Sequence, residues 1–254
     1  MKLELHDVTK IFRLSRKQMK ENKTNDKYLT AVNKLSLSIE PGIIYGLLGP
    51  NGAGKTTTLR MIASLIKPKS GEILFNGEDI YKLDGEYRKE VGFLTSELKL
   101  DDFFTPDYTF TYMSRLYGIP EEEIETNKRR LFDAFGVNKF KDVQIKNLST
   151  GMKQKVSLAV SLVHNPKVII FDEPTNGLDL VASKEVENFL LSFKSDERII
   201  VISTHIFSLA EKLCDRVGII ASGKLIKETD REQLKKDNMT LEDLFFSVYE
   251  GGEE

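Results

Sequence analysis

The sequence predicts an α/β fold built around a mainly parallel β-sheet. Short apolar runs that suit buried strands occupy residues 43–48, 168–171 and 199–203. The first run is followed by a helical pattern at 55–66, and the second by another at 181–193. Strand, helix and strand at this spacing are typical of parallel sheets, because a helix returns the chain to the starting edge.

The first part of the chain also shows antiparallel β character. Residues 1–8 and 35–39 alternate apolar and polar side chains, and the second segment ends at Pro41-Gly42. Residues 72–75 precede the turn Asn76-Gly77, which favours a hairpin. We therefore expect an N-terminal antiparallel β subdomain beside the parallel core, and a further hairpin around Ser222-Gly223.

Helical periodicity replaces the strand pattern in the middle of the chain. Apolar residues recur at three- and four-residue steps over 112–135, with a helix start after Pro120, and another helix is predicted from Ser149 to about 165. Thr240 and Asp243 form a capping-box pattern before a last short helix. A single domain over 1–254 is expected, with three parts: an α/β core with the β subdomain at 1–95 and 166–230, a helical subdomain at 96–165, and a helical tail at 231–254.

Composition excludes several classes of protein. A formal net charge of −2 argues against a dedicated nucleic-acid binder. Cys214 is the only cysteine, so an internal disulfide cannot form and the reducing cytosol is expected. The N-terminus lacks the apolar core of a secretory signal, and no stretch approaches the roughly 18 apolar residues that span a bilayer. Any membrane-spanning segment is therefore expected in another chain.

Residues 13–30 are unusually basic, with six Lys or Arg residues against Glu21 and Asp26. The segment reads as a long solvated hairpin connection. An alternative reading is a basic surface for anionic lipid or a partner.

The segment 49–57, GPNGAGKTT, carries the most specific chemistry in the sequence. It fits the G-x-x-x-x-G-K-[ST] pattern between an apolar strand and a helix, where glycines let backbone N–H groups surround phosphate oxygens. Lys55 is expected to reach the β- and γ-phosphates, and the Thr56 hydroxyl is expected to bind magnesium. The predicted nucleotide-binding residues here are Gly49, Asn51, Gly52, Ala53, Gly54, Lys55, Thr56 and Thr57.

Two carboxylates end the strand at 168–171. The carboxyl end of a strand in a parallel sheet faces the ligand crevice, so Asp172 suits the metal-holding role of a phosphate-loop enzyme. Glu173 is expected to polarise the attacking water as general base.

A second phosphate-accepting helix start is predicted at 148–152, LSTGM. Ser149 is a good N-cap, and Gly151 permits close approach to the helix N–H groups. By itself this pattern is that of an ordinary capped helix. Together with the phosphate loop it indicates a composite site that another subunit completes.

These residues together resemble an ABC-type ATPase, the nucleotide-binding subunit of an ATP-binding-cassette transporter. GPNGAGKTT resembles the Walker A motif, LSTGM the signature motif and VIIFDEP the Walker B motif. Residues 176–179 resemble the D-loop, which ends at Asp179, and His205 ends a strand as the family's switch histidine does. Phe12 stands where the family places an aromatic against adenine. The likeness covers nearly the whole chain and implies a RecA-like mixed sheet in a P-loop NTPase cassette.

The resemblance also implies a mechanism and partners. Two ATP molecules with Mg²⁺ would be held between the Walker A motif of one subunit and the signature of the other, in a head-to-tail dimer. Ser149 and Gly151 would contact the γ-phosphate bound to the partner, whether that is a second copy or a paralogous ATPase. Glu173 and His205 would be catalytic, and a transmembrane permease would place the dimer at the cytoplasmic face of the cell membrane.

The sequence departs from the family pattern at two motifs. Ser96 stands where the family has a glutamine that touches magnesium and relays nucleotide state to the membrane subunit. The signature reads LSTGM instead of LSGGQ but keeps Ser149 and Gly151. The basic 13–30 segment, the residues around Ser96 and the ending at 240–246 are similar to bacterial ABC-2-type exporter ATPases of the sodium-efflux, drug and peptide export group. A soluble ABC ATPase acting on ribosomes or DNA is the alternative; a GTPase lacks support because no N-K-x-D sequence occurs.

Overall fold

The structure, a computed structural model, describes residues 1–21, 24–83, 85–95 and 99–250, and it confirms the α/β fold. A mixed six-stranded sheet forms the core in the order β10-β9-β3-β8-β7-β6. β3 pairs in parallel with β8 and β9, and β7 in parallel with β6 and β8, while β10 is antiparallel to β9. The strands are β3 Ile44–Leu48, β6 Val91–Leu94, β7 Val168–Asp172, β8 Ile199–Thr204, β9 Arg216–Ala221 and β10 Lys224–Asp230.

A second, antiparallel sheet has the order β2-β1-β4-β5 and corresponds to the predicted β subdomain. Its first two strands are much longer than the segments expected at 1–8 and 35–39. Register shifts between β1 and β2 break the period-two pattern that marks a strand, and Asp7 there has a φ of 48°. The strands are β1 Leu3–Arg13, β2 Tyr28–Ile39, β4 Ser70–Phe75 and β5 Glu78–Asp79.

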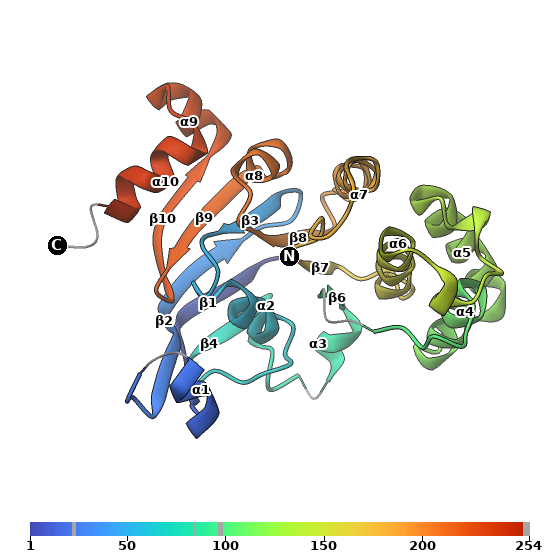
Figure 1. The fold of residues 1–254 in the computed structure, drawn as a ribbon, viewed down its shortest axis with the longest axis horizontal. Helices are drawn as coiled ribbons and strands as arrows, with labels where there is room; N and C mark the ends of the chain where they lie inside the picture. The colour runs from blue at the N-terminus through green and yellow to red at the C-terminus, as the bar shows by residue number, and fades with distance from the viewer. Residues whose placement is uncertain (22–23, 84, 96–98, 251–254) are drawn as a thin grey trace.

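Helices cover both faces of the six-stranded sheet (Figure 1). α2 (Lys55–Ile62) and α3 (Glu86–Lys89) lie on one side, and α7 (Leu180–Phe193) and α8 (Phe207–Leu213) on the other. Neighbouring residues of the central strands accordingly belong to different cores: Ile169 packs with the α7 side and Ile170 with the α2 side.

The helical subdomain lies at one end of the longest axis of the molecule, on the right in Figure 1. It contains helices α4 (Pro106–Leu116), α5 (Glu121–Phe135) and α6 (Thr150–Ser161), with 3₁₀ turns η1 (Val137–Lys139) and η2 (Ile145–Asn147). α4 begins earlier than expected because Thr105 caps it, accepting a hydrogen bond from the backbone N–H of Tyr108.

Two helices end earlier than the sequence pattern predicts. α2 was expected to reach residue 66, but Ser64 adopts a left-handed φ of 57°. α6 was expected to reach about residue 165, but Leu162 and Val163 bond to carbonyls three residues back instead of four. This tightened turn ends the α-helix while the apolar periodicity continues.

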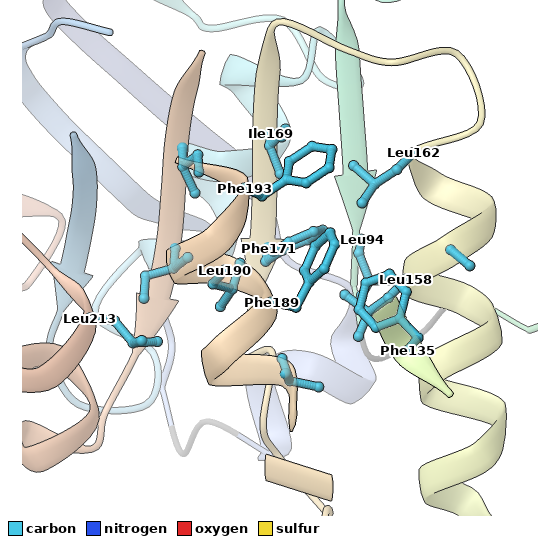
Figure 2. Close-up of a cluster of buried hydrophobic side chains, with 14 of the residues drawn as sticks. Leu94, Phe135, Leu158, Leu162, Ile169, Phe171, Phe189, Leu190, Phe193 and Leu213 are labelled. Atoms are coloured by element: carbon cyan, nitrogen blue, oxygen red, sulfur yellow. The ribbon is translucent and has the colours of Figure 1, made fainter. Parts of the chain in front are cut away.

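Aromatic packing joins the helical subdomain to the sheet. Phe135 of α5 packs against Phe189 of α7 with ring centroids 4.0 Å apart, and both lie in one cluster with Phe171 of β7 (Figure 2). Burial of each ring contributes roughly 1.5–3 kcal/mol, so this cluster fixes how the subdomain meets the core.

The tail forms two helices, α9 (Arg231–Asp237) and α10 (Leu241–Glu250). The predicted cap is confirmed, since Asp243 accepts from the Thr240 N–H and Thr240 Oγ1 accepts from the Asp243 N–H. The basic connection between β1 and β2 contains one short helix, α1 (Arg16–Glu21), with no buried residue. Of the helices in the described ranges, none combines the length and apolar character needed to cross a bilayer.

Candidate functional site

The phosphate loop connects β3 to α2 and can adopt its path only with glycine at two positions. A Cβ atom on Gly49 would lie 2.1 Å from the carbonyl oxygen of Ile220, and one on Gly54 would lie 2.4 Å from that of Ala31. Gly54 also has a φ of 105°, which other residues rarely adopt. The loop is thus pressed against strands of both sheets, which holds its backbone N–H groups in a fixed cup.

Lys55 is the first residue of α2 and is buried beneath this loop. Its Nζ donates to the carbonyl oxygens of Gly49, at 2.7 Å, and Pro50, at 3.2 Å. Burial lowers the pKa of the ammonium, while Glu173, with Oε1 3.7 Å from Nζ, opposes that shift. A buried cation at the start of a helix is suited to bind phosphate, which would compensate the burial.

Asp172 ends β7 and Glu173 follows it at the carboxyl edge of the sheet, as the sequence predicts. The Ser203 hydroxyl donates to Asp172 Oδ1, and its Oγ accepts from the Glu173 N–H at 3.1 Å. Glu173 has a φ of 52°, so the chain turns sharply at this position and directs the two carboxylates differently. Ser203 orients both acidic residues, and sequence reasoning assigned it no role.

His205 follows β8 and meets Glu173. Its Nδ1 lies 2.9 Å from Glu173 Oε1, and the ring is about two-fifths exposed. The structure therefore brings Lys55, Glu173 and His205 together around one carboxylate oxygen.

A single pocket contains most of the predicted nucleotide-binding residues. Phe12 and Glu173 line it together with the phosphate loop. Sequence reasoning missed five lining residues from the β1–β2 and β9–β10 hairpins, because neighbouring strands bring them there. The lining comprises Phe12, Leu29, Thr30, Ala31, residues 51–57, Glu173, Ser222 and Gly223.

The predicted signature lies elsewhere on the same chain. Ser149 caps α6, accepting from the Met152 N–H at 3.2 Å, and neither Ser149 nor Gly151 lines the nucleotide pocket. In Figure 1 α6 belongs to the helical end of the molecule and is separated from α2 by β6 and β7. Asp179 caps α7 through the Ala182 N–H at 2.8 Å, and Ala182 lies beside Gly151, so signature and D-loop form one surface.

The remaining predicted residues include one outside the described ranges. Ser96 is among the residues that the structure does not describe. His164, which belongs to none of the motifs, stacks on Tyr117 with ring centroids 4.1 Å apart and bonds through Nε2 to the Val91 carbonyl, which indicates a structural role.

Comparison with known proteins identifies the family. The sequence profile of the family described as "ABC transporter" matches residues 32–176, more than half of the chain. The chain belongs to the ABC transporter family.

Several ATP-binding proteins of this ABC transporter family are similar over most of their length. The ABC transporter ATP-binding protein NatA of Bacillus subtilis is 40% identical over 82% of this chain and 85% of its own. The bacitracin transport ATP-binding protein BcrA of Bacillus licheniformis is 37% identical over 82% and 67%, respectively. The lantibiotic transport ATP-binding protein SrtF of Streptococcus pyogenes is 34% identical over 85% and 90%. The predicted likeness to exporter ATPases is therefore confirmed.

Solved structures confirm the ABC cassette fold. The ATP-binding subunit of an ABC transporter superposes with a TM-score of 0.82 at 24% identity, covering 98% of this chain and 100% of that chain. A dimeric cassette in a post-hydrolysis state bound to ADP and Pi superposes with a TM-score of 0.78 at 23% identity, covering 90% and 98%.

Proposed function

We propose that this ABC cassette hydrolyses ATP at a site shared by two subunits and thereby drives an ABC-2-type exporter at the cytoplasmic face of the membrane. The proposal rests on one observation: the phosphate loop and the signature of the same chain lie apart from each other. Each half is formed, but a second subunit is needed to join them.

Within one subunit the pocket supplies phosphate binding. Backbone N–H groups of the loop and the Lys55 ammonium bind the β- and γ-phosphates, and Phe12 stacks on the adenine ring. Thr56 and Asp172 provide hydroxyl and carboxylate oxygens, the ligands that Mg²⁺ prefers, so these residues fit magnesium together with phosphate oxygens and water. Bound magnesium would withdraw charge from the phosphates.

Hydrolysis needs a water in line with the γ-phosphate and a base for its proton. Glu173 is the candidate base, and the Ser203 contact to its backbone fixes its place at the strand end. With His205 Nδ1 directed to Glu173, the other ring nitrogen is available to the γ-phosphate. Water adds to phosphorus as the bond to the ADP oxygen breaks, giving ADP and inorganic phosphate.

The second subunit would supply Ser149 and Gly151 to the exposed side of the γ-phosphate. The surface beside them carries apolar residues that no described part of the same subunit covers. Leu180 and Val181, next to Asp179, are 91% and 71% exposed. Burial of these two residues favours association in which the D-loops lie at the interface.

Mixing two inactive variants tests the shared site. Lys55→Ala removes the phosphate-binding cation, and Gly151→Asp places a carboxylate against the partner's γ-phosphate. Each variant alone should lose ATPase activity. A mixture forms heterodimers with one intact composite site, so activity should return to a substantial fraction of wild type. A mixture as inactive as its components would contradict the shared site.

An apolar groove between α2, β6 and α4 is the feature that suits contact with a membrane partner. The side chains of Leu65 and Tyr112 on its rim are 56% and 47% exposed. We infer that a helix of the transmembrane permease occupies it. Its apolar and aromatic lining includes Leu65, Val91, Phe93, Leu100, Phe104, Tyr112, Met113 and Tyr117.

Purification from the native source separates transport from the alternative of a ribosome- or DNA-acting ATPase. The relatives described above carry transport names, and the net charge of −2 does not favour nucleic acid. A polytopic membrane protein should co-purify with this chain, and that association should weaken when Tyr112→Asp is introduced into the groove. Co-purification with ribosomes and without a membrane protein would overturn the transport function.

A further inference from the structure

The connection between β1 and β2 is longer than its folding role requires. Arg13 pairs with Tyr28 at the end of the hairpin, so residues 14–27 form the whole loop. About two to five residues suffice to close a hairpin. The loop instead contains α1, which buries none of its residues. This segment therefore adds exposed surface and contributes little to the core.

That surface is strongly basic. Arg16, Lys17 and Lys20 lie within about 100° of one another around α1, since each residue turns the helix by about 100°. We define the basic surface as Lys10, Arg13, Arg16, Lys17, Lys20, Lys27, Lys67 and Lys69. The acidic residues Glu21 and Asp26 also belong to it. With them the surface carries a formal +6 in a chain of net −2, and the rest of the chain carries −8.

Backbone contacts bring the separate parts of the basic surface together. Lys10 Nζ donates to the carbonyl oxygen of Lys67 at 2.5 Å, and the Lys69 N–H donates to Thr9. The Leu14 N–H donates to the Lys27 carbonyl at 2.9 Å, which joins the two ends of the loop. Residues 67–69 thus lie beside Thr9 and Lys10 of β1, the strand that leads into the loop with α1.

The basic side chains are nearly free of ion pairs. Within the described ranges the only such pair on this surface is Lys17–Glu21, at 3.8 Å between two exposed side chains. Exposed pairs of this kind contribute little to stability. The surface therefore presents uncompensated positive charge to a partner.

The position of the surface indicates the partner. Leu65, on the rim of the proposed permease groove, is two residues from Lys67. α1 and α3 lie along the same lower edge in Figure 1, whereas α9 and α10 lie at the opposite edge. If the groove seats a permease helix, as proposed above, the basic surface faces the same bilayer.

We propose that the basic surface binds the anionic lipid headgroups of the membrane beside the permease. This inference rests on the proposed function for its orientation, but the binding itself can be measured without the permease. Each Lys or Arg at an anionic surface strengthens attraction, and the attraction is screened by salt. The surface would hold the cassette flat against the membrane and raise its local concentration near the partner.

Flotation of the purified full chain with vesicles tests the proposal. Vesicles of phosphatidylcholine with about one-third phosphatidylglycerol should bind the chain at 50 mM salt, and pure phosphatidylcholine vesicles should not. The triple variant Arg16→Gln, Lys17→Gln, Lys20→Gln should bind about a hundredfold more weakly, since each charge contributes about fivefold at low salt. Raising the salt to 1 M should abolish binding by the wild-type chain.

A control triple variant removes the same charge from the opposite edge. Lys227→Gln, Lys235→Gln, Lys236→Gln should leave vesicle binding unchanged, because these exposed residues lie in β10 and α9. ATPase activity of both triple variants in solution should match wild type, which separates this test from that of the ATPase function. Equal binding to both kinds of vesicle, or equal losses in both triple variants, would overturn the proposal. So would binding to a random oligonucleotide that is stronger than vesicle binding and is lost in the α1 variant.

Discussion

Glu173 and His205 are in direct contact, with Nδ1 of the imidazole 2.9 Å from Oε1 of the carboxylate. Lys55 Nζ lies 3.7 Å from the same oxygen. The Glu173 carboxylate, the proposed base, is therefore held between a cation and an imidazole. If the phosphates of ATP bind Lys55 in place of Glu173, this oxygen keeps its contact with His205 and becomes available to the attacking water. ATP binding would in this way ready Glu173 to accept a proton.

Glu173→Gln should separate ATP binding from hydrolysis. The amide keeps the size of the carboxylate but cannot accept the proton of water, so turnover should fall at least about a hundredfold. ATP should still bind, and size-exclusion chromatography with ATP and magnesium should show a stable dimer. Undiminished turnover by this variant would contradict the assignment of Glu173 as the general base.

His205→Ala should lower kcat with little change in KM. In the proposed mechanism the imidazole acts on the γ-phosphate and on Glu173, and His205 is not among the residues that line the pocket beside Phe12. We expect a loss of about a hundredfold in kcat, measured as phosphate release. His6→Ala on the exposed side of β1 is the matched control and should behave as wild type. Equal losses in both variants would remove the special role of His205.

Gly151→Ala offers a test of the signature that a folding defect cannot imitate. An added Cβ would meet Ala182 at 3.6 Å and Leu178 at 3.9 Å, which are ordinary contacts. Alanine also favours the first turn of α6 over glycine, so thermal stability should stay the same or rise by up to about 1 kcal/mol. ATPase activity should nevertheless fall at least tenfold, because the methyl group approaches the partner's γ-phosphate. Wild-type activity in this variant would mean that Gly151 faces no nucleotide.

The local motifs were predictable from sequence because each depends on a few neighbouring residues. The phosphate loop needs glycine where its backbone contacts Ile220 and Ala31. These two positions are Gly49 and Gly54, the glycines of the sequence motif. The strand ends at Asp172 and just before His205 followed from apolar runs that stop at a polar residue.

The parts that were missed depend on contacts between distant segments. Ser203 reads as one more small residue in a buried strand, and only the pairing of β7 with β8 brings it to Asp172. α8 is seven residues long, too short for a periodic pattern to be distinguished from a loop. The hairpin residues of the nucleotide pocket, such as Gly223, become neighbours of the phosphate loop only through sheet packing.

The C-terminal helix should matter for catalysis as well as stability. Phe245 of α10 packs on Phe207, two residues after His205, and the Leu241 N–H donates to Glu211 Oε1 at 2.7 Å. Phe245→Ala should destabilise the chain by about 3 kcal/mol and lower ATPase activity at temperatures where it remains folded. Phe246→Ala removes a ring that is 45% exposed and should cost less than about 1 kcal/mol. Urea unfolding and steady-state ATPase assays measure both, and indistinguishable variants would contradict a role for the α8–α10 contact.

The single cysteine should report on opening of the core. Cys214 is buried against Gly46 of β3, and burial raises the pKa of its thiol to about 12. A thiol that stays protonated and covered is unreactive, so a maleimide at pH 8 should modify the native chain only as fast as it opens. Because the folded pKa exceeds the ordinary value of 9.0, the stability linked to this group is present below pH 9 and is lost as pH rises toward 12. In urea titrations, the free energy of unfolding should fall less between pH 8 and pH 10.5 for Cys214→Ala than for the wild-type chain. Rapid labelling of the native chain, at the rate of a free thiol, would show that the β3–α8 contact is not closed in solution.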